Sequence, residues 1–91
     1  SEMQHASVIA QFVVEEFLPD VAPADVDVDL DLVDNGVIDA LGLLKVIAWL
    51  EDRFGIAADD VELSPEHFRS IRSIDAFVVG ATTPPVEAKL Q

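Results

Sequence analysis

Hydrophobic residues near the start of the chain recur at intervals of three and four, as they do on one face of an amphipathic helix. They are Ile9, Phe12, Val13 and Phe17. The pattern predicts a helix over about residues 4–18. Pro19 ends it, because proline disfavours the helical conformation at the residue before it.

A second helical pattern follows Asp39, a residue type that caps helix N-termini by accepting hydrogen bonds from free backbone N–H groups. Its spacing predicts a core-facing stripe of Leu43, Val46, Ile47, Leu50 and Phe54. Gly55 is a natural stop just past the end. We therefore expect a helix that opens at Asp39 and closes before Gly55.

Two further helices are predicted downstream. Ser64-Pro65-Glu66 has the residue types that begin a short helix. Ser73 with Asp75 begins the last helix, and Gly80 closes it. The residues of this helix predicted to pack inward are Ile74, Phe77 and Val78.

The connection over residues 19–38 is long and unsuited to helix, since it contains Pro23 and Asn35-Gly36. Its hydrophobic residues alternate with aspartates, which imitates a half-buried strand, but no second strand is predicted to pair with it. We interpret it as an extended loop that pins Leu30 or Leu32 into the core. The fold class is then all-α: a four-helix bundle of three main helices and one short helix with a long first loop.

The 91 residues suggest one domain without internal repeats. Residues 1–3 are expected to be a flexible start, in which Ser1-Glu2 resembles an expression remnant before a natural Met3. Residues 4–80 form the domain, and residues 81–91, with two adjacent prolines, are expected to be a flexible tail.

The net charge of −13 restricts the partners. Residues 15–39 alone carry nine acidic side chains and no Lys or Arg. Such a surface repels nucleic acid and anionic membranes and favours partners with basic patches. No hydrophobic run approaches the roughly 20 residues of a membrane span, and no signal peptide is visible. We expect a soluble, cytoplasmic monomer.

Enzyme chemistry finds little support. The chain has no Cys, its two histidines lie far apart, and no base accompanies a serine nucleophile. An EF-hand beginning at Asp27 would need Gly and Glu where Leu32 and Ile38 stand, so the acidic run predicts a solvated loop rather than a metal site; a weak cation site is the alternative. We predict no catalytic residue and no dedicated metal site. Asp59-Asp60 is interpreted as a solvated pair.

Two aromatic side chains are considered separately. Trp49 is expected to pack on the flank of its helix, with a ligand-stacking platform as the second interpretation. His67 is expected to be a surface residue without a function.

The sequence around residue 40 carries a motif. Leu32-Val33-Asp34-Asn35-Gly36-Val37-Ile38-Asp39 precedes it, Leu41 follows it, and the helix ends in Leu50-Glu51-Asp52-Arg53-Phe54-Gly55-Ile56. Over residues 4–80 the chain resembles a discrete acyl or peptidyl carrier protein of the phosphopantetheine-binding family. That family has an Asp-Ser-Leu triplet where this chain has Asp39-Ala40-Leu41.

The resemblance implies that a phosphopantetheinyl transferase attaches a 4'-phosphopantetheine arm to a serine at position 40, flanked by Asp39 and Leu41. The arm would hold an acyl or aminoacyl group as a thioester, loaded by an adenylating or acyl-loading enzyme and presented to downstream biosynthetic enzymes. The expected docking face is Leu41, Leu44, Lys45, Ala48, Glu51 and Asp52. Periodicity alone leaves core packing open for Leu41 and Leu44.

Two residues depart from the family pattern. Lys45 stands where many fatty-acid carriers have an acid, which favours stand-alone carriers of natural-product pathways. Ala40 has no hydroxyl, so no arm can be attached covalently there. We interpret it as an engineered replacement of serine, and the alternative is a natural armless relative that acts as a docking or regulatory module. The cargo and the type of pathway depend on the partner enzymes.

Overall fold

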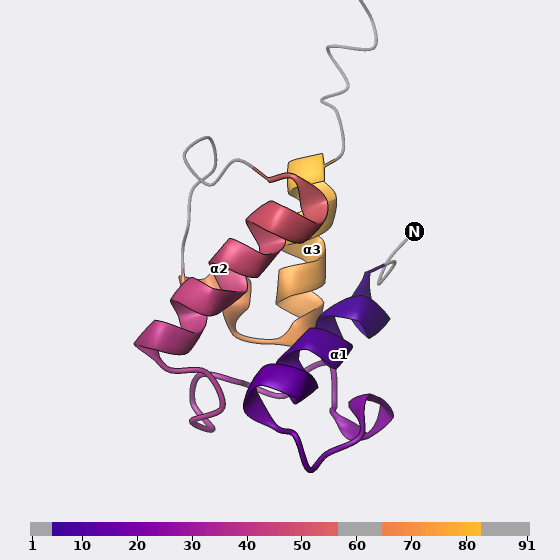
Figure 1. Ribbon diagram of the computed structural model, residues 1–91, viewed down its shortest axis with the longest axis vertical. Helices are drawn as coiled ribbons and strands as arrows, with labels where there is room; N and C mark the ends of the chain where they lie inside the picture. Colours follow the sequence, from indigo (N-terminus) through magenta and orange to yellow (C-terminus); the bar gives the residue numbers. More distant parts are fainter. Residues whose placement is uncertain (1–4, 57–64, 83–91) are drawn as a thin grey trace, which may run out of the picture.

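The computed structural model describes residues 5–56 and 65–82, and these residues contain three α-helices and two short 3₁₀ helices. The α-helices are α1 (Ala6–Phe17), α2 (Ala40–Phe54) and α3 (Ile71–Thr82), and the 3₁₀ helices are η1 (Pro23–Asp25) and η3 (Pro65–Phe68) (Figure 1). Neither described range contains a strand. The predicted all-α fold with three main helices is confirmed, and the predicted short helix is η3, whereas η1 was not predicted.

The core lies between the three α-helices, and each of them contributes one buried stripe. The largest fully buried side chains are Ile9, Val13, Leu32, Val46, Leu50, Phe68, Ile71, Ile74 and Val78. Leu43, Ile47 and Phe54 pack against this cluster while half-exposed. The stripe that periodicity predicted for α2 is therefore correct, and Gly55 ends α2 with a left-handed φ of 68°.

The long first loop is pinned to the start of α3. Leu32 is fully buried, whereas Leu30 is half-exposed, so the prediction of a pinned leucine is confirmed for Leu32. The backbone N–H of Leu32 donates to the carbonyl of Arg69 at 2.6 Å, and the N–H of Arg72 donates to the carbonyl of Val28 at 2.9 Å. These contacts join the loop to residues some 40 positions later in the sequence.

The prediction that this loop is extended is wrong. It folds into η1 and a series of turns, because its aspartates bond to the backbone of their own segment. The Asp27 carboxylate accepts the N–H of Asp29 at 2.8 Å, and the Asp31 carboxylate accepts the N–H of Asp34 at 2.8 Å. Gly36 adopts a φ of 73° in the last of these turns.

Both predicted ends of α3 are wrong. The helix begins at Ile71, because Ser70 and Ser73 cap it reciprocally: the N–H of Ser73 donates to Ser70 Oγ at 3.1 Å, and the N–H of Ser70 donates to Ser73 Oγ at 3.0 Å. At the other end Gly80 does not close the helix. Its φ is not positive, and the helix continues to Thr82.

Asp75 joins the two ends of the described chain. It is only 3% exposed, and its carboxylate accepts the backbone N–H of His5 at 2.7 Å. This carboxylate from α3 thereby satisfies a free donor at the start of α1, where His5 makes no side-chain cap. The interpretation of Asp75 as a helix-start residue misses this role.

Some predictions fall outside the described residues. They concern residues 1–4, Asp59-Asp60, Ser64 and residues 83–91. Among the helices that the structure does describe, none has the length and apolar character to cross a membrane.

Candidate functional site

Position 40 is the first residue of α2 and is exposed to solvent. Asp39 precedes it in an extended conformation, and its carboxylate accepts the backbone N–H of Gly42 at 2.7 Å. This is the N-cap that the sequence predicted, and it fixes the first turn of the helix. A side chain at position 40 can therefore be reached from solvent while its backbone is held in place.

The segment before Asp39 is anchored at two buried side chains. Ile38 is 2% exposed, and its backbone N–H donates to the carbonyl of Leu32 at 3.0 Å. The N–H of Val37 donates to the same carbonyl at 2.9 Å. Since Leu32 is itself bonded to Arg69, the start of α2 is connected through this turn to the start of α3.

Arg72 in the first turn of α3 and Arg69 just before that helix partly neutralise the acidic loop. Arg72 binds the Asp29 carboxylate with Nε 2.6 Å from Oδ1, and this hydrogen bond lowers the pKa of Asp29 below its usual 3.8. Arg69 lies 3.7 Å from Asp31 and 3.5 Å from Asp34. The pKa of Asp31 is lowered chiefly by the backbone N–H of Asp34 and less by the charge of Arg69.

The outward face of α2 combines exposed apolar and charged side chains. Leu41 is 72% exposed and Leu44 is 62% exposed, so neither packs in the core. The remaining residues predicted for this face, Lys45, Ala48, Glu51 and Asp52, are exposed as well. Two large exposed leucines beside an accessible helix N-terminus form a surface suited to another protein.

The side chains with open alternatives have structural explanations. Trp49 stacks on Phe12 of α1 at 4.3 Å between ring centroids with 11° between the planes, which agrees with packing on the helix flank. His67 is half-buried and stacks on Phe77 at 5.2 Å, with Nδ1 buried and unpaired, so the prediction of a surface residue is wrong. Within residues 5–56 and 65–82, no group of three potential ligands could hold a metal ion.

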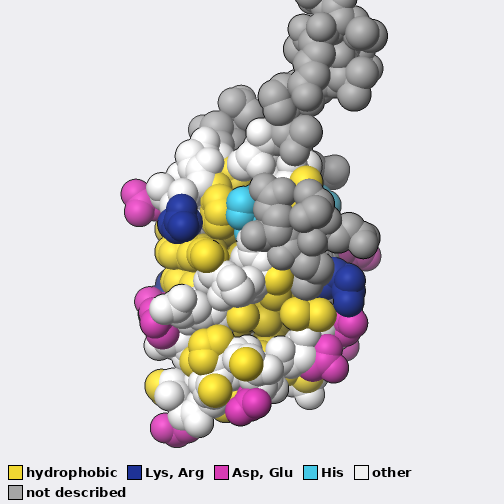
Figure 2. All heavy atoms as spheres, turned by 90° about the vertical axis from the view of Figure 1, so that its right-hand side faces the viewer, with side chains coloured by type: hydrophobic (Ala, Val, Ile, Leu, Met, Phe, Trp, Pro, Cys, Tyr) yellow, Lys and Arg dark blue, Asp and Glu magenta, His cyan; other side chains and the backbone are white. Residues whose placement is uncertain are grey.

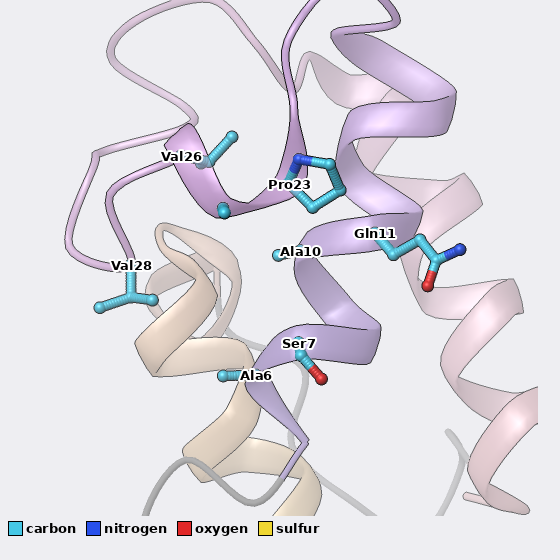
Figure 3. Close-up of a pocket in the computed structure, with 8 residues that line it drawn as sticks. Ala6, Ser7, Ala10, Gln11, Pro23, Val26 and Val28 are labelled. Carbon is cyan, nitrogen blue, oxygen red and sulfur yellow. The ribbon is translucent and has the colours of Figure 1, made fainter.

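A shallow cavity of about 480 Å³ lies elsewhere, between α1 and η1. Its walls are mostly small and apolar, with Ala10 on α1 and with Pro23 and Val26 on the segment around η1 (Figure 3). Figure 2 shows hydrophobic side chains in the middle of one face of the molecule and acidic side chains at its edge. None of the residues that line the cavity belongs to α2, so it forms no part of the surface around position 40.

The sequence analysis did not identify one residue near the site, Gly42, as important. Gly42 is buried within the first turn of α2, although Ala40 and Leu41, the two residues before it, are exposed. A glycine inside a helix costs stability relative to alanine, so its presence indicated a close approach by another group. That group is the ring of Phe17 at the end of α1.

The comparisons with known proteins agree with this geometry. The family model described as phosphopantetheine attachment site matches residues 12–78, which is most of the chain. The chain belongs to this family of carrier proteins, which are not enzymes themselves. The family implies 4'-phosphopantetheine as its cofactor.

Curated relatives include an acyl carrier protein of Rhodococcus erythropolis, 30% identical over 85% of this chain and 81% of its own length. D-alanyl carrier proteins are also similar. That of Streptococcus suis is 34% identical over 78% of this chain and 86% of its own, and that of Abiotrophia defectiva is 33% identical over 57% of this chain and 66% of its own.

A solved structure provides a much closer likeness. The solution structure of KstB-PCP in kosinostatin biosynthesis is 99% identical, covers 98% of this chain and 100% of that chain, and superposes with a TM-score of 0.67. The fold of the described chain is thus that of a carrier protein.

Proposed function

We propose that this protein, with a serine at position 40, carries an acyl or aminoacyl group as a thioester on a 4'-phosphopantetheine arm. The observation that carries the proposal is the exposure of position 40 directly after the Asp39 cap. A helix N-terminus favours a nearby phosphodiester anion through its free N–H groups and its dipole. Leu41 beside it would complete the site.

The residue present does not fit covalent attachment, since Ala40 has no oxygen. Its surroundings do fit, because the cap, the buried turn before it and the exposed leucines after it are all intact. We infer that Ala40 replaces a natural serine by design.

The alternative is a natural armless relative that acts as a docking or regulatory module. The exposed leucines of α2 would suit such a role equally well, since they could bind a partner protein whether or not an arm is attached at position 40. The codon for residue 40 in the source genome distinguishes the two. A serine codon supports replacement by design, and an alanine codon supports the armless module.

The partners we propose are a phosphopantetheinyl transferase, an adenylating or acyl-loading enzyme, and downstream enzymes of a natural-product pathway in the cytoplasm. The face formed by Leu41, Leu44, Lys45, Ala48, Glu51 and Asp52 would dock them. Lys45 places a positive charge among the apolar residues of this face, whereas Glu51 and Asp52 are negative. A partner therefore needs an acidic group near Lys45 and basic groups farther along α2.

The test is to incubate the Ala40→Ser variant with coenzyme A and a promiscuous transferase and to measure its intact mass. We expect the mass gain of one phosphopantetheinyl group. The matched control is Ala48→Ser, which places a serine on the same exposed face two turns later and should gain nothing. No gain in Ala40→Ser, with a known carrier modified in parallel, would overturn the carrier proposal.

A further inference from the structure

The ring of Phe17 packs against Gly42 in the first turn of α2, and the space between them is too small for a Cβ atom on residue 42. A Cβ atom added to Gly42 would lie 2.9 Å from Phe17 Cε1 and 3.3 Å from Cζ. The same atom would lie 3.2 Å from Asp39 Oδ1, the oxygen that caps the helix. The first of these distances is shorter than carbon atoms tolerate, so only glycine allows the ring to sit there.

Phe17 belongs to a row of aromatic side chains that contact one another. It meets Phe12 edge to face, with centroids 6.2 Å apart and 87° between the planes. Phe12 in turn stacks on Trp49 of α2, and Trp49 meets Phe54 edge to face at 5.6 Å. Phe17 and the other three rings are half-buried, and Phe17 is in contact with Phe12. A methyl group at position 42 has to displace either this ring or the turn that carries position 40.

Glycine lowers helix stability relative to alanine, so a glycine at position 42 suggests that the contact with Phe17 requires it. Glycine in a helix is less favourable than alanine, and Gly80 in α3 shows the ordinary case, since a Cβ there would meet nothing within 4 Å. Gly42 differs because it is buried under an aromatic ring, three residues after the cap and two after the proposed attachment position. Its contact with Phe17 fixes how the turn is oriented relative to α1.

We propose that Phe17 and Gly42 are positioning residues for arm attachment: the ring, seated on the glycine, holds the first turn of α2 so that a serine at position 40 is aligned with the transferase. This inference rests on the proposed function. The two residues act through the backbone of residues 39–42, and neither needs to contact the enzyme. The consequence is a kinetic effect on the chemical step, distinct from an effect on docking.

The experiment compares transferase kinetics in the Ala40→Ser background. Gly42→Ala should lower kcat by about tenfold to a hundredfold with KM nearly unchanged, because small misplacements of a reacting group are costly in rate. Adding Phe17→Leu, which shortens the side chain facing the new methyl group, should restore kcat most of the way. Gly80→Ala is the control, and it should leave both constants unchanged.

The outcomes separate the two proposals. If the Ala40→Ser parent is not modified at all, the proposed function fails. If the parent is modified and Gly42→Ala is modified just as fast, the positioning inference is overturned while the function stands. A slow Gly42→Ala that Phe17→Leu does not rescue removes Phe17 from the inference.

A readout without activity uses the chain as it stands. The α-protons of Gly42 should carry a ring-current shift in the NMR spectrum that Phe17→Leu abolishes, whereas the α-protons of Gly80 should not respond. Unchanged Gly42 shifts in Phe17→Leu would show that the ring does not sit on this turn, and the inference would fail.

Discussion

Arg72 at the start of α3 donates two hydrogen bonds to the carboxylate of Asp29 in the first loop. Nε lies 2.6 Å from Oδ1, and Nη2 lies 3.2 Å from Oδ2. The backbone N–H of Arg72 also donates to the carbonyl of Val28, so side chain and backbone hold the same short segment. Such bidentate pairs fix geometry as well as charge, and this one joins the acidic loop to the bundle.

This pair gives the stability a defined pH dependence. The hydrogen bond from Arg72 holds the pKa of Asp29 below 3.8, so its contribution is present above the ordinary pKa and is lost as the pH falls through the lowered value. We expect Asp29→Asn to melt below the parent at neutral pH. The difference in Tm should be constant above about pH 5 and should shrink below about pH 3.8.

Thermal melts by circular dichroism between neutral and acidic pH measure this difference. Asp20→Asn is the control, since Asp20 is an exposed acid of the same loop for which the described structure shows no ion pair. It removes the same charge without the arginine contact. A gap between parent and Asp29→Asn that persists at the acidic end would contradict the assigned role of Arg72.

Leu32 should be the most sensitive residue of the first loop. Its side chain is fully buried, and its backbone receives or makes bonds with Arg69, Val37 and Ile38. We expect Leu32→Ala to lower the free energy of unfolding by about 2–5 kcal/mol, the usual range for a leucine removed from a core. Val33→Ala, at a side chain that is 37% exposed, should change it by less than about 0.5 kcal/mol. Urea titrations of both variants decide this, and equal effects would refute the pinning role.

Periodicity was sufficient to locate the three α-helices, because their hydrophobic stripes face one core. Local chemistry at Asp39 and Gly55 also marked both ends of α2, whereas the ends of α3 were misplaced. Periodicity was insufficient where contacts join distant residues. The position of the first loop against α3 depends on Arg69 and Arg72, and the Asp75 carboxylate binds the backbone of His5, 70 residues away. No local pattern encodes such pairs.

At the candidate site, too, the sequence predicted the local features but not those that depend on contacts between helices. The cap at Asp39 and the start of α2 at residue 40 were predicted correctly, since both are properties of one helix end. Helical spacing could not decide whether Leu41 and Leu44 pack inward, because a leucine on the edge of a stripe fits either environment until the neighbouring helices are placed. The contact of Phe17 with Gly42 was inaccessible for the same reason, since it depends on how α1 approaches α2.

Two leucines of α2 should behave in opposite ways. Leu50 is 1% exposed and Leu44 is 62% exposed. Leu50→Ala should therefore lower the free energy of unfolding by about 2–5 kcal/mol, whereas Leu44→Ala should change it by less than about 0.5 kcal/mol. In the Ala40→Ser background, Leu44→Ala should instead raise the KM of the transferase, because it removes apolar contact area from the docking face. A stable Leu44→Ala variant with an unchanged KM would exclude Leu44 from that face.

Asp39 should stabilise the helix through its cap rather than through a specific partner. Its carboxylate accepts the N–H of Gly42 at 2.7 Å, so Asp39→Ala leaves that donor without its side-chain acceptor and should cost about 1 kcal/mol, within a range of about 0.5–2. Asn caps helices about as well as Asp, so Asp39→Asn should retain most of the stability while removing the charge. In the Ala40→Ser background, Asp39→Asn then tests whether the transferase needs the carboxylate itself. Modification at the parent's rate would show that the cap is sufficient, whereas a loss of rate with unchanged stability would assign the charge a role in recognition by the enzyme.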